Sequence, residues 1–331
     1  MLEVATDYII FIHGINTNES RVQLTYADEL FGLIQKASKS LSPTLKNVTL
    51  YWADVNEAGE QEILEVYRES PIWKSFWFRE FREKQILQFT SSTALYISRC
   101  AGARVADRLK QQVQKGLSAY QPEDRLHLIA HGLGTFILFD MLFAARWDQE
   151  NVPGYDSISV IRDAVYGVEP NWEKGIRLAS ISTMGSPLGL FSLIDVDKTD
   201  VEKKNDRGEV VNSHDITPRL QRLLKRLQKT LGGKLPWLNF AHPGDPMASP
   251  LVPLLPFMID EKRRYLDVQD IILRSVDLSD VPMQPSNQAL FALLYSGVAH
   301  NSYWQSEEVA QRIVLSMGRS SILPELGEPT S

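Results

Sequence analysis

The stretch LHLIAHGLGTFILFD, residues 126–140, decides the fold. Its apolar run at 126–130 predicts a buried strand, and Gly132 stands where the chain must turn. Alternate positions of the turn carry small residues, as close packing of a strand against the next helix requires: Ala130, Gly132 and Gly134. Residues 135–147 are apolar nearly all round, which predicts a helix buried against a sheet. The turn has neither the GxGxxG pattern of dinucleotide-binding proteins nor a P-loop lysine.

The composition is typical of a globular domain with a sizeable core. Of the 331 residues, 44% are hydrophobic and 23% charged. The formal net charge is −6, so no nucleic acid is expected as a partner and no bulk attraction to an anionic membrane. The single cysteine, Cys100, excludes an intramolecular disulfide and fits a reducing compartment.

The N-terminus predicts a core strand rather than a signal peptide. Position 3 is acidic, and Asp7 directly precedes a short apolar run, whereas a signal peptide has a basic start and a longer apolar core. No window reaches the roughly 18 uninterrupted apolar residues of a membrane span. A cytoplasmic protein is therefore the expectation, and secretion without an N-terminal signal stays open.

The pattern along the chain predicts an α/β fold. Six short apolar runs are typical of buried parallel strands, at residues 8–12, 48–52, 126–130, 178–184, 237–241 and 271–276. Helical spacing between most of them predicts a mostly parallel central sheet flanked by helices. We expect a single domain, 1–331, with a helical cap-like insertion at 57–117 and a charged loop plus amphipathic helix at 195–234.

The two insertions differ in character. The first contains an aromatic cluster that can cap an apolar site or pack helices onto the domain: Trp73, Phe76, Trp77, Phe78, Phe81 and Phe89. In the second, a helix at 218–231 carries five leucines on one face, with basic residues largely off that face. This helix suits a peripheral membrane contact or a protein partner, or it places its leucines in the core, which we favour. A lid over the site, formed by 73–81 and 218–231, is a further hypothesis.

Three other segments place polar residues where predicted strands end. The stretch IIFIHGINTN, 9–18, leaves a strand at His13, and Asp245 stands in a Pro-Gly-Asp-Pro turn after another strand. His300 lies in a loop of small residues before a helix. Each signal is weak alone, because aspartate is common in turns and a lone histidine is usually structural. Asp277 and Asp280 also follow a predicted strand, but the turn chemistry and chain order favour Asp245.

These motifs together resemble those of the lipase- and esterase-like α/β hydrolases. The nearest group is the serine esterases that include GPI-inositol-deacylase-like proteins. The resemblance rests on IIFIHGIN, LIAHGLGTFILFD, ISTMGSPLGL, WLNFAHPGDPMA and GVAHNSYW, and it spans residues 8–317 apart from the insertions. It implies an α/β-hydrolase fold and hydrolysis of a small acyl or lipid-like ester without a cofactor. A run PLVPLLPFM at 250–258 can wall an apolar pocket for such a substrate.

The resemblance also implies roles for particular residues. Chain order in this superfamily runs nucleophile, acid, base, which matches position 132, Asp245 and His300. The backbone N–H groups of Ile15 and Leu133 are implied as the oxyanion hole. His13 and His131, beside these positions, are the candidates for substrate contacts.

The chain departs from the group at the elbow, whose pattern I-x-H-S-L-G has serine where Gly132 stands. Without that serine, turnover is expected to fall by roughly a million-fold, the scale found in another triad enzyme. Either an active esterase has been inactivated, or the chain is a natural pseudo-hydrolase that binds a ligand or partner. The intact acid, base and oxyanion motifs favour the first history. A weaker alternative lets His300 activate water in place of the serine.

Other chemistry is poorly supported by the sequence. Ser182 and Ser186 fall on the next strand and its loop, and Thr135 falls on the elbow helix. Cys100 lies in a helical segment with no sign of a base beside it. The six histidines show no metal-ligand spacing, so no metal is expected.

Overall fold

A computed structural model describes residues 5–14, 24–39, 44–55, 57–83, 93–94, 96, 99–148, 150–166, 175–191, 218–260, 262–273 and 297–319. Its six strands are β1 (Thr6–Ile12), β2 (Thr44–Leu50), β3 (Arg125–His131), β4 (Arg177–Met184), β5 (Leu235–Ala241) and β6 (Leu266–Ile272). They form one sheet in the order β2-β1-β3-β4-β5-β6, and all five neighbouring pairs are parallel. The predicted α/β class with a parallel sheet is confirmed.

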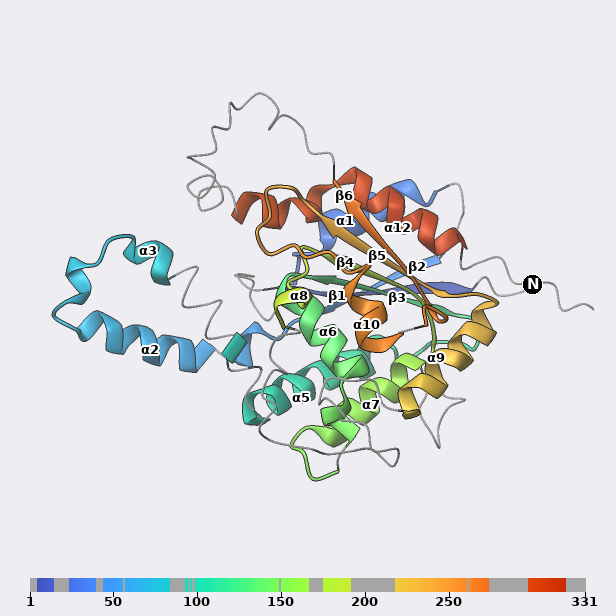
Figure 1. Cartoon of the computed structure of the whole chain (residues 1–331), viewed down its shortest axis with the longest axis horizontal. Coiled ribbons are helices and arrows are strands. Elements are labelled where there is room, and N and C mark those ends of the chain that lie inside the picture. The colour runs from blue at the N-terminus through green and yellow to red at the C-terminus, as the bar shows by residue number, and fades with distance from the viewer. Residues whose placement is uncertain are drawn as a thin grey trace, which may run out of the picture.

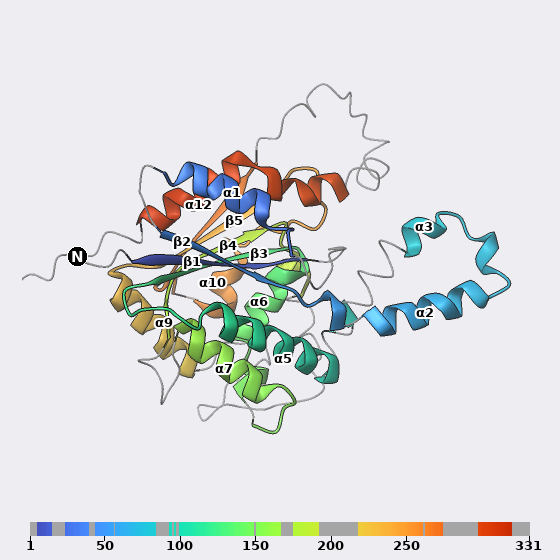
Figure 2. The same cartoon turned by 180° about the vertical axis from the view of Figure 1, so that it is seen from behind.

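Helices cover both faces of this sheet (Figures 1 and 2). One face carries α1 (Asp28–Ala37) and α12 (Glu307–Arg319), which pack against each other. The other face carries α5 (Arg99–Gly116), α6 (Leu133–Phe143), α7 (Tyr155–Tyr166), α9 (Pro218–Leu231) and α10 (Leu254–Ile259). Short elements complete the described chain: η1 (Ala53–Val55), α2 (Glu57–Glu69), η2 (Trp73–Ser75), α3 (Arg79–Phe81), η4 (Ala145–Asp148), α8 (Leu188–Phe191) and η8 (Ser302–Gln305).

Strand alternation divides the core into two layers. Along β1, Tyr8, Ile10 and Ile12 pack with the larger helical layer, while Ile9 and Phe11 pack with α1 and α12. Successive side chains of a strand point to opposite faces, so a strand that is apolar at every position must be covered twice. All eleven residues of α6 are buried, which agrees with the apolar character predicted for this helix.

Five of the six predicted strands are confirmed, and the sixth was misplaced. The apolar run at 271–276 predicted a strand there, but β6 begins at Leu266 and ends at Ile272. β6 is one of the two edge strands of the described sheet, and most of its residues are only partly buried. A strand with one uncovered edge can carry Asp267, Gln269 and Asp270, so the search for a continuous apolar run missed it.

The predicted insertion at 57–117 has two structurally different parts. α2, η2 and α3 form an arm that projects from the body (Figures 1 and 2). α5, in contrast, belongs to the helical layer, because Val105, Leu109 and Val113 lie in the main core and the helix packs against α7 and β2. The described part of this segment is therefore an arm followed by a core helix.

The predicted helix at 218–231 is confirmed as α9, and the leucines whose side chains the structure describes lie in the core or against it. Leu224 and Leu227 are buried and Leu231 packs against the same cluster, beside β4 and β5. This burial accounts for the described part of the leucine stripe, which therefore gives no support to a membrane contact or a lid. The charged loop before it lies outside the described residues. Among the described helices, none has the length and apolar character needed to cross a bilayer.

The strand order fixes where a site can form. The chain goes from β1 to β2 on one side and then returns to β3 on the other side of β1. In open parallel sheets, ligands bind outside the carboxyl ends of the strands at such a switch point. Here β1 ends before His13 and Gly14, and β3 ends at His131.

Candidate active site

The turn between β3 and α6 has the sharp geometry that its sequence predicted. Gly132 has φ 52° and ψ −129°, a combination that residues with a side chain adopt only under strain. Its N–H donates to Met184 O on β4 at 2.9 Å, and its carbonyl accepts the Thr135 hydroxyl at 2.8 Å. Gly134 lies against the end of β1, where a Cβ would stand 2.4 Å from His13 O. The turn is thus fastened to strands on both sides.

Asp245 and His300 meet above the end of β5. Asp245 lies in the turn after that strand, and its Oδ2 is 2.9 Å from His300 Nδ1. The same oxygen accepts the Tyr303 hydroxyl at 2.8 Å, while Oδ1 accepts Met247 N–H at 2.9 Å. Burial alone would raise the pKa of Asp245, but the hydrogen bond and the electrostatic attraction from His300, with the bonds from Tyr303 and Met247, bring that pKa below its usual range. The carboxylate is therefore held ionised beside the imidazole.

The other nitrogen of His300 faces the elbow. A Cβ built on Gly132 would lie 2.8 Å from His300 Nε2 and 3.3 Å from Cε1. Within the described residues, Nε2 makes no hydrogen bond, and the imidazole is held through Nδ1. The structure thus brings positions 132, 245 and 300 together. A side chain at position 132 would meet the imidazole at once.

His131 and His13 flank this group and are both buried. His131 Nε2 donates to the backbone carbonyl of His300 at 2.6 Å, and burial, with electrostatic repulsion between the two neighbouring imidazoles, lowers the pKa of His131 to about 3. Its ring is therefore neutral and fixes the loop that carries His300. The centroids of the two imidazoles are 4.4 Å apart.

His13 is held by the end of β2. Its Nδ1 donates to Gly14 O at 2.5 Å, its Nε2 accepts Trp52 N–H at 3.3 Å, and its ring stacks on the Trp52 indole with centroids 5.3 Å apart. Burial lowers the pKa of His13 to about 4. Both histidines thus have structural partners, and their role in substrate contacts stays a prediction.

Leu133 begins α6, so its N–H has no partner within the helix. No other hydrogen bond from this N–H occurs among the described residues, and it lies at the positive end of the helix dipole. It is available to a developing negative charge beside the elbow. Ile15, the second expected donor, lies outside the described residues.

Two residues at this site were missed by the sequence reasoning. Tyr303 is buried, and its hydroxyl joins Asp245 Oδ2 to His242 N–H, which it accepts at 2.8 Å. Gly185 has φ 55°, and a Cβ there would lie 2.5 Å from Asp245 Oδ2. Both stand in the quoted motifs GVAHNSYW and ISTMGSPLGL, but nothing in sequence spacing indicates that they contact Asp245.

The competing residues have other surroundings or lie outside the described residues. The Ser186 hydroxyl hydrogen-bonds to that of Thr135 at 2.8 Å, and both side chains are buried. Ser182 is buried on β4. The Cys100 side chain, Asp277 and Asp280 lie outside the described residues. In the described part of the chain, no cluster of His, Cys, Asp or Glu could hold a metal ion.

In the run at 250–258, the side chains that the structure describes contribute to the core. Leu251 and Leu255 are fully buried in the main cluster. The described part of this run therefore gives no independent support to a lipid-like substrate.

Comparisons with known proteins identify no family for this chain. No protein-family model matches it, and no curated protein matches it. Among solved structures, it is similar to the 1.35 Å crystal structure of a protein from Xanthomonas campestris pv. campestris that is assigned to the alpha/beta hydrolase superfamily. The sequence identity is 10% and the TM-score 0.30, over 88% of this chain and 96% of the other.

Proposed function

We propose that this site is built for carboxylic-ester hydrolysis of the serine type and that glycine occupies its nucleophile position. One observation carries the proposal. The Asp245–His300 pair turns its free nitrogen toward the place where a side chain on residue 132 would begin, 2.8 Å from His300 Nε2. Nucleophile, base and orienting carboxylate stand in this relation in triad enzymes.

The parent reaction is acyl transfer from an ester to a serine at position 132. His300 takes the serine proton and passes it to the leaving alcohol, while Asp245 holds the imidazole in the productive tautomer. The Leu133 N–H stabilises the oxyanion, and Ile15 is expected to supply the second donor. Water activated by His300 then releases the acid. With glycine at 132 no acyl-enzyme can form, so we expect this chain to be nearly inactive.

A second candidate is a non-catalytic protein of the same fold that binds a ligand or a partner. The close approach of His300 Nε2 to the Cβ position favours it, because real Cβ atoms essentially never stand 2.8 Å from such an atom. The His300 imidazole occupies the space that a side chain on residue 132 would need, and glycine adopts the backbone angles of the elbow without strain. Hydrolysis by His300 acting on water alone is the weaker alternative, since it forgoes covalent catalysis.

The Gly132→Ser variant tests the proposal. We expect it to hydrolyse a simple activated ester and to form a covalent adduct with a serine-directed phosphonate, detected by mass spectrometry of the intact protein. The imidazole must withdraw by a few tenths of an ångström, and the strained elbow costs about 1–3 kcal/mol, which a typical domain stable by about 5–15 kcal/mol tolerates.

Gly132→Ala is the matched control, because it carries the same strain and the same contact with His300 but gains no nucleophile. If both variants are folded, and the serine variant is no faster than the alanine variant and forms no adduct, the esterase proposal is wrong. The binding-protein candidate would then lead.

A further inference from the structure

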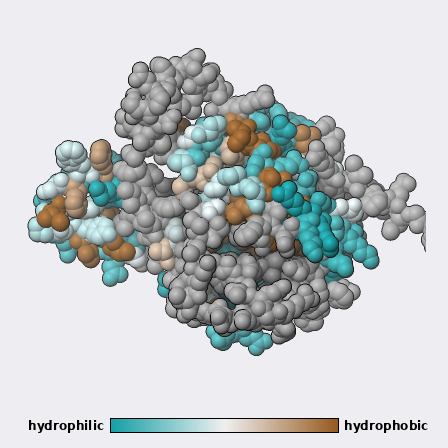
Figure 3. Space-filling model, in the orientation of Figure 1, coloured by the Kyte–Doolittle hydropathy of each residue, from teal (hydrophilic) through white to brown (hydrophobic). Residues whose placement is uncertain are grey.

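The tip of the projecting arm carries strongly exposed aromatic side chains. Trp77 is 80% exposed, Phe78 70% and Phe76 40%. Apolar residues of the arm stand well away from the body in Figure 3. The arm begins directly after η1, at the carboxyl edge of the sheet where the candidate site lies. Clustered exposed rings of this size mark a surface that meets another apolar phase or partner.

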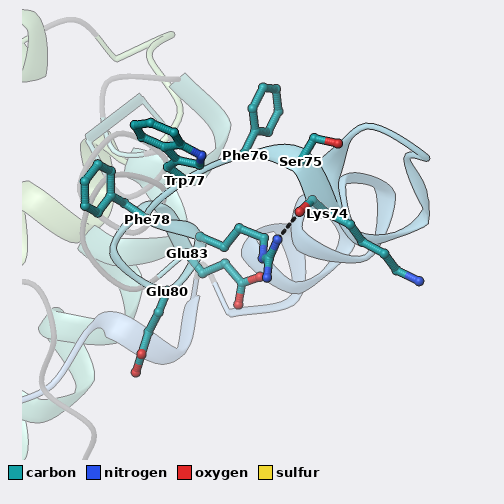
Figure 4. A pocket seen from close by; sticks show the side chains of 8 residues that line it. Lys74, Ser75, Phe76, Trp77, Phe78, Glu80 and Glu83 are labelled. Carbon is teal, nitrogen blue, oxygen red and sulfur yellow. Dashed lines mark hydrogen bonds between the residues drawn. The ribbon is translucent and has the colours of Figure 1, made fainter.

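The turn that presents these rings is held in one shape. Phe78 has φ 56°, which is uncommon for a residue with a side chain and needs support from its surroundings. Arg79 donates to Lys74 O across the turn, and Arg82 Nε donates to Trp77 O at 3.1 Å. Figure 4 shows the Trp77 and Phe78 rings extending away from the side chain of Lys74.

A second layer supports the same turn from the arm's interior. Trp73 is buried and meets Phe76 edge-on, with ring centroids 5.7 Å apart. The Arg82 guanidinium lies 5.1 Å from the centre of the Phe76 ring. Trp77 and Phe78 take no part in these ring contacts. Packing within the arm therefore does not account for large apolar side chains at these two positions.

The charges of the arm are segregated. α2 carries five glutamates and one arginine, whereas residues 70–83 carry Lys74, Arg79 and Arg82 against two glutamates. One of these, Glu83, is paired with Arg68 of α2 at 2.7 Å. The tip is thus locally positive in a chain of net charge −6. Because α2 is acidic and the aromatic tip is basic, an anionic partner would be contacted by the tip and not by α2.

We propose that this tip, residues 72–82, docks on an anionic lipid surface, with Trp77 and Phe78 at the boundary between headgroups and acyl chains. Tryptophan favours that boundary, since its ring is apolar and its N–H can remain hydrated. The cations beside the rings complement anionic headgroups. A hollow of about 740 Å³ lies beside both features, because Lys74 and Arg79 line it with the two rings, and Glu80 and Glu83 line it as well. Figure 4 shows Lys74, the two rings and the two glutamates around it.

The area of the patch argues against a second copy of the chain as the occupant. The three rings, of about 150–250 Å² each, offer roughly 300–500 Å² at these exposures, and Ile72, which is 63% exposed, adds one smaller apolar side chain. A stable protein interface buries about 800 Å² on each partner. A lipid surface needs no complementary shape and accepts a narrow tip. The proposal does not depend on the esterase proposal, and its test measures no activity.

The full chain is tested by flotation with vesicles of phosphatidylcholine alone and of phosphatidylcholine with 30–40% phosphatidylglycerol, a mixture chosen as roughly that of an anionic leaflet. We expect binding to the anionic vesicles and a loss of at least tenfold in the partition coefficient for Trp77→Ser/Phe78→Ser. Lys74→Gln should weaken binding by roughly fivefold, the equivalent of about 1 kcal/mol for one cation near the surface.

The matched control is Ile272→Thr/Leu315→Ser, which removes two apolar side chains that are 60% and 62% exposed on the body. It should bind the vesicles as the parent does. The proposal is overturned if the parent does not float, if the control loses as much binding as the tip variant, or if neutral vesicles bind equally well. Self-association that the tip variant abolishes, without vesicle binding, would make the patch an interface between copies and would also overturn it.

Discussion

Gly185 offers a way to disturb the Asp245–His300 pair without changing either residue. It directly follows β4, has φ 55°, and donates its N–H to Phe240 O at 3.0 Å. A Cβ at this position would lie 2.5 Å from Asp245 Oδ2 and 3.0 Å from His300 Nδ1. Gly185→Ala must therefore displace the carboxylate, and with it the 2.9 Å hydrogen bond to the imidazole.

Two costs add in this variant. Placing a residue with a Cβ in the left-handed region costs about 1–2 kcal/mol, and forcing a methyl group into a filled space costs about 1–3 kcal/mol. We therefore expect Gly185→Ala to lower the free energy of unfolding by about 2–5 kcal/mol. In the Gly132→Ser form, a misplaced acid should also slow the reaction with a phosphonate by up to about 10⁴-fold.

Urea unfolding followed by tryptophan fluorescence measures the first effect, and the rate of phosphonate adduct formation measures the second. Gly32→Ala is the matched control, since a Cβ there meets nothing within 4 Å and lies inside α1. It should stabilise the protein by up to about 1 kcal/mol. If Gly185→Ala instead unfolds at the same urea concentration as the parent and reacts at the same rate, contact with Gly185 does not position the pair.

Two further predictions follow from the site. In the Gly132→Ser form, Asp245→Asn should cost several orders of magnitude in ester turnover with an unchanged circular dichroism spectrum, whereas Asp277→Asn should cost only a few-fold; the opposite ranking would reassign the acid. Burial lowers the pKa of His13 to about 4 from an ordinary 6.5, so the unfolded chain binds the proton more readily as pH falls below 6.5. The free energy of unfolding should consequently drop by up to about 2–3 kcal/mol between pH 6.5 and 4.5 through this ring. His13→Phe should flatten that part of the curve in urea titrations, and an unchanged slope would show that the ring does not titrate in this way.

The sequence predicted what depends on local patterns. β1, β3, β4 and β5 are buried on both faces, so each appears as a mostly apolar run. β6 has no such run, and for that reason the strand was predicted at the wrong residues. α5 lay inside a predicted insertion because its helical pattern does not tell which layer it joins.

Contacts between segments that are distant in the sequence could not be predicted from the sequence. The turn chemistry favoured Asp245 over Asp277, but only the fold brings Asp245 within 2.9 Å of His300. The support from Tyr303 and the close fit of Gly185 depend on where β4, β5 and the last helices meet. No periodicity in the chain carries that information. The burial of His131 likewise follows from its place under the His300 loop.

The Asp245–His300 pair is supported by contacts that do not involve a side chain at position 132. Asp245 is held by Tyr303 and Met247 N–H, the His300 loop is held by His131, and the elbow is tied to Met184. None of these contacts uses a side chain at position 132. Loss of a serine there leaves each bond in place, and mutation of Asp245 would leave a buried tyrosine hydroxyl without its acceptor, which costs about 1–3 kcal/mol. Stability alone is therefore a sufficient reason for the pair to be present. The presence of Asp245 and His300 is therefore weaker evidence for a recently inactivated esterase, as against a binding protein, than the sequence suggested. Reaction of the Gly132→Ser variant with an ester or a phosphonate is the observation that distinguishes the two.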